Sequence, residues 1–233
     1  MRTRRFVVAV LALVLSVSAC TSEDGQEADP NLPKGADLLA DAAAATNDIT
    51  STHFTLKVNG QIPGLSVQSA EGDLTAPAGK DGAARGQVRM TLLGRLIEGD
   101  FVLIDEKIYL KGPTGDFQKL DASLVTGVYD PAAILDPDRG IAHLLESFQD
   151  PKTVATEDID GVSAYKIVGK VAKDVIAALV PGIESDVDAT VWVREDGDHQ
   201  PVKATAVLPS EGNPSVDVTL SKLNEPVEIT APN

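Results

Sequence analysis

The stretch His53-Phe-Thr-Leu-Lys-Val58 (HFTLKV) indicates the kind of fold that this chain adopts. Phe54, Leu56 and Val58 alternate with the polar residues Thr55 and Lys57. A period of two residues is typical of a β-strand that buries one of its faces. The stretch therefore predicts a strand in a sheet with one apolar face.

Further strands are expected on the C-terminal side of this one. Residues 67–74 form a second candidate, and Val88, Met90 and Leu92 alternate with polar residues in a third. Residues 101–104 and 107–110 are expected to form a hairpin that turns at Asp105-Glu106. Five short strands in about sixty residues predict an antiparallel meander.

The remaining chain mixes helical and extended patterns. Asp37 is a plausible N-cap for a helix over residues 37–46. Further helices are expected around a stripe of apolar residues at helical spacing (Ile141, Leu144, Leu145 and Phe148) and over residues 175–180. A hairpin over 159–168, with Asp160-Gly161 at its turn, and strands at 189–193, 202–208 and 216–220 complete the pattern. This order predicts one α+β domain, an antiparallel sheet with helices packed on one face.

The N-terminus reads as an export signal. Three arginines precede an apolar run, residues 6–17, that is too short to span a bilayer as a helix. The small residues Ser18 and Ala19 follow, and then Cys20, the only cysteine of the chain. An ordinary secretory signal, in which Cys20 has no role, is the alternative interpretation.

Val17-Ser18-Ala19-Cys20 resembles the bacterial lipobox. The resemblance implies cleavage before Cys20 and acylation of its sulfur. We therefore expect a lipoprotein signal peptide over residues 1–19 and a flexible tether over 20–35, interrupted by Pro30 and Pro33. A single domain should occupy residues 36–233. Two or three acyl chains on Cys20 would hold the protein at a membrane.

The net charge restricts the possible partners. The formal charge of the 233 residues is −15, and loss of the leader arginines makes it three units more negative. Binding of nucleic acid needs clustered basic residues, so no nucleic-acid partner is expected. Direct attraction to anionic lipid headgroups is also disfavoured.

No catalytic or metal-binding motif is evident in the sequence. His53, His143 and His199 have no zinc-type spacing, and Ser66 and Ser163 lack the second glycine of a nucleophile elbow. Two acidic clusters, residues 157–161 and 195–199, are interpreted as hairpin turns and not as calcium loops. No metal and no enzymatic activity are expected, although a carboxylate pair for glycoside hydrolysis is left open.

The predicted apolar faces are built mainly from small aliphatic residues, and aromatic residues make up 4% of the chain. Such faces pack into an ordinary filled core. They also leave a hollow when a curved sheet holds them apart. The pattern alone leaves both possibilities open.

Four separated segments resemble the mycobacterial LppX/LprA/LprF/LprG lipoproteins, and most closely the LprG branch. They are KVNGQIPGLSVQSAEGDL (57–74), GVYDPAAILDPDRGIAHLLESF (127–148), DGVSAYKIVGKV (160–171) and ATVWVREDGDHQPVKA (189–204). The resemblance implies a strongly curved antiparallel sheet, a half-barrel like those of LolA, LolB and LppX, with helices on its concave face and a lipid-sized hydrophobic cavity between them.

The same resemblance implies a role as a lipid carrier in the cell envelope. The cargo would be triacylated glycolipids (phosphatidylinositol mannosides, lipomannan and lipoarabinomannan) or triacylglycerol, moved toward the outer envelope with a major-facilitator-type export pump. The protein is expected to act as a monomer without a cofactor, anchored at the outer face of the plasma membrane or in the cell wall. The residues expected to line the cavity are Phe54, Leu56, Val58, Val88, Met90, Leu92, Ile141, Leu144, Leu145, Val175, Ile176 and Leu179. The alternative is an envelope-anchored interaction or scaffold protein, which predicts a filled core and an exposed apolar patch.

Overall fold

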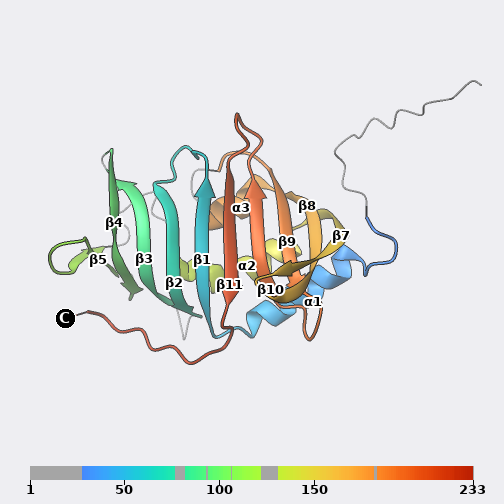
Figure 1. Ribbon diagram of the computed structural model, residues 1–233, viewed down its shortest axis with the longest axis horizontal. Helices are drawn as coiled ribbons and strands as arrows, with labels where there is room; N and C mark the ends of the chain where they lie inside the picture. Colours follow the sequence, from blue (N-terminus) through green and yellow to red (C-terminus); the bar gives the residue numbers. More distant parts are fainter. Residues whose placement is uncertain are drawn as a thin grey trace, which may run out of the picture.

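The computed structural model describes residues 28–76, 82–92, 94–105, 107–121, 131–180 and 183–232. Within these ranges, eleven strands form one open antiparallel sheet in the order β6-β5-β4-β3-β2-β1-β11-β10-β9-β8-β7 (Figure 1). The strands are β1 Ser51–Asn59, β2 Val67–Thr75, β3 Ala83–Leu92, β4 Arg95–Ile104, β5 Lys107–Lys111, β6 Gln118–Asp121, β7 Gln149–Ile159, β8 Val162–Val171, β9 Val187–Arg194, β10 Pro201–Val207 and β11 Ser215–Ser221.

The sheet consists of two meanders joined at its centre. β1 to β6 follow one another outward in one direction, and β11 back to β7 do so in the other. The join is the antiparallel pairing of β1 with β11, in which Phe54 lies opposite Leu220 and Val58 opposite Val216. The first and the last strand of the chain are therefore neighbours in the middle of the sheet.

The helices lie together on the concave face, behind the sheet in Figure 1. They are α1 Gly35–Asn47, the 3-10 helix η2 Pro131–Leu135, α2 Ile141–Glu146 and α3 Lys173–Leu179. The expected N-cap of α1 was wrong, because Lys34 takes that position with an extended backbone and makes no capping hydrogen bond. In the described part of the chain, no helix is long and apolar enough to cross a membrane.

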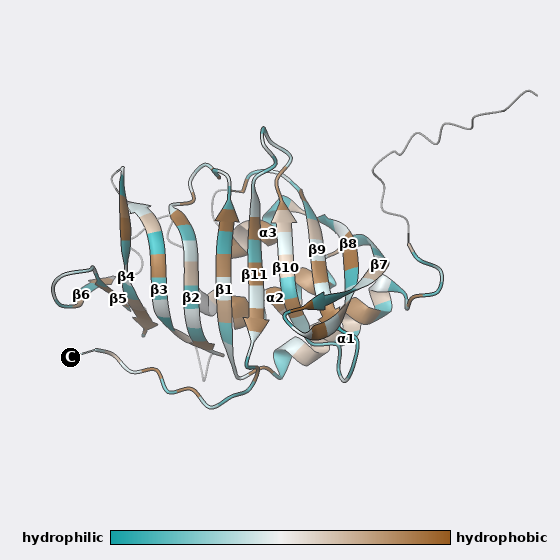
Figure 2. Cartoon of the chain, viewed as in Figure 1, coloured by the Kyte–Doolittle hydropathy of each residue, from teal (hydrophilic) through white to brown (hydrophobic). Residues whose placement is uncertain are grey.

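The concave face of the sheet and the helices share one hydrophobic core. In β1 the exposed fractions are 0% for Phe54 and 1% for Leu56, whereas the intervening Thr55 and Lys57 are exposed. Figure 2 shows the same alternation as apolar and polar bands along the strands. The prediction of an α+β fold with helices on one face of an antiparallel sheet is confirmed.

The largest difference from the expected elements is at the edge of the sheet. β7 occupies residues that no strand was predicted to cover before Ile159. Its segment carries Pro151 and mostly polar side chains, and its pairing with β8 is interrupted by two register shifts. Such features are typical of an edge strand, and they hide the alternation on which the prediction depended.

The two ends of the described chain run beside the sheet. The N-terminal segment reaches β7, where the backbone N–H of Asp29 donates to the carbonyl of Thr153 at 3.0 Å. The C-terminal segment passes the ends of β1 to β3, where the side-chain oxygen of Asn224 accepts hydrogen bonds from the backbone N–H (2.7 Å) and the hydroxyl (3.0 Å) of Thr50. Arg85 of β3 donates to the carbonyl of Glu228 at 3.1 Å.

Candidate functional site

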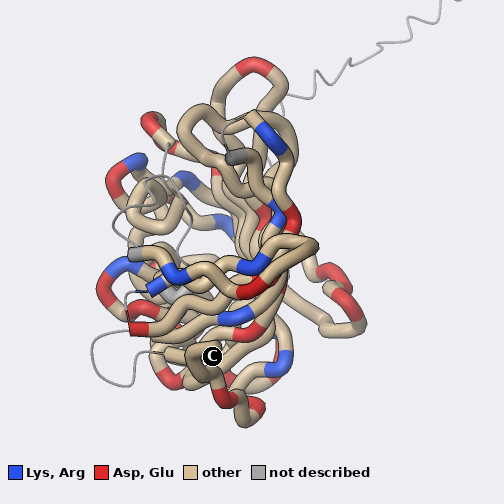
Figure 3. Tube along the Cα trace, turned by 90° about the vertical axis from the view of Figure 1, so that its left-hand side faces the viewer, with Lys and Arg blue, Asp and Glu red and all other residues tan. Residues whose placement is uncertain are grey.

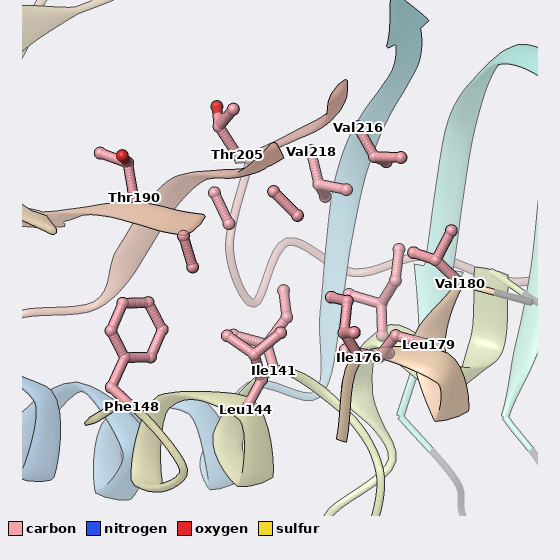
Figure 4. Close-up of a pocket in the computed structure, with 14 residues that line it drawn as sticks. Ile141, Leu144, Phe148, Ile176, Leu179, Val180, Thr190, Thr205, Val216 and Val218 are labelled. Carbon is pink, nitrogen blue, oxygen red and sulfur yellow. The ribbon is translucent and has the colours of Figure 1, made fainter. Parts of the chain in front are cut away.

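An apolar pocket lies between the short helices and one half of the sheet (Figure 4). Its volume is about 50 Å³, and α2 and α3 form one wall while β9, β10 and β11 form the other. The residues that line it are Ile134, Ile141, Leu144, Phe148, Ile176, Leu179, Val180, Ala189, Thr190, Ala204, Thr205, Ala206, Val216 and Val218.

Small side chains on the sheet create the space. In the strand register, Gly169 of β8 pairs with Ala189 of β9, Ala189 with Ala206 of β10, and Ala206 with Val216 of β11. This small-residue row crosses four strands at right angles to their direction. The branched side chains of α2 and α3 face this small-residue row. Because the row has short side chains, the helices and the sheet do not fill the space between them.

The pocket offers almost no polar group to a ligand. Two of the lining residues are polar, Thr190 and Thr205, and Figure 4 shows both side chains pointing away from the helices. The hydroxyl of Thr205 donates instead to Oδ1 of Asp217 at 2.6 Å. The pocket therefore suits an aliphatic group and provides nothing that would activate a substrate.

Four of the residues expected in a cavity line this pocket. They are Ile141 and Leu144 of α2 and Ile176 and Leu179 of α3. Their helical spacing places each pair on the side of its helix that faces the sheet.

The other expected lining residues lie elsewhere. Phe54, Leu56, Met90 and Leu145 are buried in the core, and Val58, Val88 and Val175 pack against it half-buried; none of them lines this pocket. Leu92 belongs to β3, but its side chain is outside the described residues, and so is Cys20. The centre of the sheet is occupied by β1 and β11, and β3 is separated from β1 by β2.

The sequence reasoning missed the floor of the pocket and Phe148 as a lining residue. Ala189, Ala204 and Ala206 sit in strands that were predicted, at alternate positions that face inward. Alanine at alternate positions of β10, beside the single alanine of β9, was the available signal, because it marks a place where a buried face lacks bulk. That β9, β10 and β11 lie side by side in the sheet was predictable, because the connections between them are short.

The residues considered for chemistry are part of the scaffold. His53 of β1 contacts Oδ1 of Asp73 at 2.9 Å through Nδ1, and Arg85 reaches Oδ2 of the same carboxylate at 3.3 Å. The hydrogen bond with His53, together with Arg85, holds the pKa of Asp73 below its ordinary value. His199 lies in a turn, with Nδ1 2.8 Å from the carbonyl oxygen of Arg194.

The acidic cluster 195–199 lies in the turn between β9 and β10, as predicted, whereas in the cluster 157–161 only Asp160 and Gly161 form a turn and residues 157–159 belong to β7. Asp160 and Gly161 both have positive φ angles, of 52° and 86°, between β7 and β8. Figure 3 shows acidic residues distributed over loops and strands with basic residues among them. Within the described ranges, no three histidine, cysteine, aspartate or glutamate residues are grouped as they would be around a metal ion.

The chain matches known proteins along most of its length. Residues 34–229 match the model of the LppX_LprAFG lipoprotein family. The lipoarabinomannan carrier protein LprG of Mycobacterium tuberculosis is 36% identical over 97% of this chain and 94% of its own length. The protein of the same name from Mycobacterium leprae is 35% identical over 98% of this chain and 96% of its own.

Two crystal structures have the same fold. LprF of Mycobacterium bovis aligns with a TM-score of 0.76 and 25% identity, over 88% of this chain and 99% of its own. The lipoprotein LppX of Mycobacterium tuberculosis aligns with a TM-score of 0.64 and 28% identity, over 84% of this chain and 98% of its own.

Proposed function

Because this chain belongs to the LppX_LprAFG lipoprotein family, we propose that it is an envelope carrier that shields the acyl chains of triacylated glycolipids, or of triacylglycerol, and moves them toward the outer envelope. The glycolipids we propose as cargo are phosphatidylinositol mannosides, lipomannan and lipoarabinomannan. The observation that carries this proposal is the apolar pocket between α2, α3 and β9–β11. A carrier needs no catalytic group, which agrees with relatives that are named as carrier proteins.

The energetics favour acyl chains as the bound group. Each methylene removed from water contributes about 0.8 kcal/mol, and the walls of the pocket present almost only apolar groups. The scaffold alternative predicts a filled core, whereas α2 and α3 stand over a row of glycine and alanine.

The small volume of the pocket supports the interpretation that this structure is the form of the carrier without bound lipid. Pockets that enclose drug-sized ligands measure roughly 300–1,000 Å³, and this one measures about 50 Å³. We infer that the pocket widens on loading as α2 and α3 move away from the sheet. Both are short helices, of 6 and 7 residues, whose N-cap residues Gly140 and Ala172 make no side-chain capping bond.

Several acyl chains need more room than this pocket. We propose that they extend along the concave face toward Phe54, Leu56 and Val58 of β1 and Val88 and Met90 of β3. The strand register connects the pocket with β1, because Val216 at the end of the small-residue row pairs with Val58.

We propose that acylation of Cys20 anchors the carrier at the outer face of the plasma membrane, with residues 20–35 as a tether. The body would act as a monomer and would pass its lipid onward with the help of a major-facilitator-type export pump. The acidic charge of the chain supports an anchor, because electrostatic attraction to anionic lipids would not retain the protein at a membrane.

Native mass spectrometry of the full chain carrying Cys20→Ala tests the proposal. This form, which lacks the proposed anchor, is purified from a mycobacterial host and then extracted with organic solvent. We expect a bound mass that leaves as an acylated lipid. A protein that is free of lipid and takes up none when phosphatidylinositol mannoside or triacylglycerol is added would contradict the proposal.

Two matched variants locate the bound chain. Ala204→Trp places a ring in the pocket and should reduce lipid occupancy at least tenfold, whereas Thr219→Trp, at an outward position of the neighbouring strand β11 and not among the lining residues, should leave occupancy unchanged. Val88→Trp reports whether cargo extends to β3. Equal occupancy in Ala204→Trp and the parent would exclude this pocket as the lipid site.

A further inference from the structure

We propose that Phe148 is the end wall of the pocket and sets the length of acyl chain that the carrier accepts. This inference rests on the proposed carrier function. It concerns a single ring, which lies where the small-residue row of the sheet reaches β8.

The position of Phe148 follows from the end of α2. The helix ends at Glu146, and Ser147 closes it with a hydrogen bond from its hydroxyl to the carbonyl of His143 at 2.8 Å. Phe148 is thus held between the end of α2 and the first residue of β7, Gln149. Its backbone is fixed by the helix on one side and by the sheet on the other.

The ring of Phe148 lies against a strand position without a side chain. A Cβ atom added to Gly169 of β8 would be 2.8 Å from Cδ1 and 3.5 Å from Cε1 of Phe148, and 2.9 Å from the carbonyl oxygen of Gln149. Real Cβ atoms do not approach other atoms within 3 Å, so glycine is what allows the ring to lie against β8.

The same glycine begins the small-residue row. From Gly169 the row continues through Ala189 and Ala206 to Val216, over three strand spacings or roughly 14 Å. An acyl chain that lies in this row would run across the strands and meet Phe148 at the β8 end. Figure 4 shows Phe148 and Val180 at opposite ends of the lining residues.

Removing the ring should therefore lengthen the pocket. Phe148→Ala would open the row as far as Gly169, and each further methylene that becomes buried should strengthen binding about fourfold. Gly169→Ala should act in the opposite direction, because the new methyl group meets Cδ1 of Phe148 and the ring has to move off β8 into the pocket. The double variant Gly169→Ala/Phe148→Ala should recover binding relative to Gly169→Ala alone.

The test is a chain-length profile measured by competition. Saturated fatty acids of about twelve to about twenty carbons displace a fluorescent fatty acid from the full chain carrying Cys20→Ala, and each variant is made in that form. We expect Phe148→Ala to favour longer chains and Gly169→Ala to favour shorter ones. Tyr165→Ala is the control, because it removes a ring from β8 that packs on the core but does not line the pocket.

The outcomes separate the two proposals. If the parent binds fatty acids and Phe148→Ala has the same profile, the end-wall assignment is wrong and the carrier function stands. If the parent binds none, both fail. Phe148→Leu, which shortens the side chain without emptying the site, should give an intermediate profile; circular dichroism identifies any variant that does not fold, and this milder variant then decides the question.

Discussion

At the scale of single residues, the outer face of the sheet is organised around Trp192. Its indole N–H donates to Oε2 of Glu157 at 2.7 Å, although β8 lies between the two strands. The contact is possible because β8 has only Ala164 at that point, with an exposed fraction of 0%. Lys166 and Lys203 lie over the ring, with Nζ at 5.6 Å and 4.8 Å from its centroid.

This arrangement makes the stability of the protein depend on pH. The hydrogen bond from Trp192, and then the one from Lys166, lower the pKa of Glu157 from its ordinary value of 4.5. A carboxyl with a lowered pKa in the folded state stabilises the protein above its unfolded pKa, and this stabilisation is lost as the pH falls through the folded value. Glu157 is 39% exposed, so solvent screening keeps the effect to about 1 kcal/mol or less.

We expect Glu157→Gln to flatten the pH dependence of stability below about pH 4.5. Urea unfolding followed by the fluorescence of Trp192, the only tryptophan, measures the free energy at each pH. Glu211→Gln, in an exposed turn, is the control and should retain the slope of the parent. An unchanged slope in Glu157→Gln would mean that other carboxyls account for the acid sensitivity.

Local sequence indicated only part of the arrangement around Trp192 and Glu157. The turn at Asp160-Gly161 was predicted because both residue types favour it. The partner of Glu157 lies 35 residues away and is reached across a third strand. No local pattern contains that information, so the acidic residue was interpreted as part of a turn alone.

At the scale of elements, β2 and β3 approach closely at a pair of glycines. Gly72 and Gly86 are directly opposite in the register. A Cβ atom on Gly86 would overlap the carbonyl oxygen of Glu71, and one on Gly72 would overlap that of Arg85. These strands therefore pack at this point without side chains, and glycine is required by the distance between the backbones.

Gly86→Ala should destabilise the protein by about 3 kcal/mol or more, because a methyl group has to displace backbone and not a flexible side chain. Urea unfolding measured by circular dichroism gives the value. Gly112→Ala is the matched control, since an added Cβ there meets nothing within 4 Å. Similar stabilities for the two variants would show that β2 and β3 separate at little cost.

The elements that were predicted and those that were missed differ in their exposure. Strands with one buried face, such as β1, β9 and β11, carry clean alternation and were expected at nearly their observed bounds. The edge strand β7 has little apolar surface to bury and was missed before Ile159. The apolar stripe through Phe148 predicted a longer helix than α2, which ends at Glu146, because helical spacing does not reveal where a chain leaves the helix.

At the scale of the whole molecule, the two halves of the sheet are joined at its centre by strands that are far apart in the chain. β1 and β11 pair there, and Asn224 binds Thr50 across 174 residues of sequence. Asn224 has a φ angle of 61°, a left-handed conformation that asparagine tolerates better than most residues. The location of the pocket depends on this pairing, which places β9–β11 beside β1. The sequence showed which faces are apolar but not where their side chains leave space.

Asn224→Ala should lower the free energy of unfolding by roughly 1–3 kcal/mol, because Thr50 loses its acceptor and the backbone conformation becomes unfavourable. Asn224→Asp keeps both features and should retain most of the stability. We expect the unfolding midpoints from Trp192 fluorescence and circular dichroism to move together, since one sheet unfolds as one unit. A Trp192 midpoint that stays in place would show that the two meanders unfold separately.

The bond between Asp29 and the edge strand β7 also has a kinetic consequence. If Cys20 carries the proposed anchor, the part of the proposed tether that precedes Asp29 would set the reach of the body, because the eight residues after Cys20, up to Ala28, span about 29 Å at most when fully extended. The body would then stay close to the membrane, so an encounter with a lipid or with the proposed membrane partner would take place at a high effective concentration. Each anchored molecule would load at a first-order rate, set by the length of the tether and independent of how many copies the cell makes.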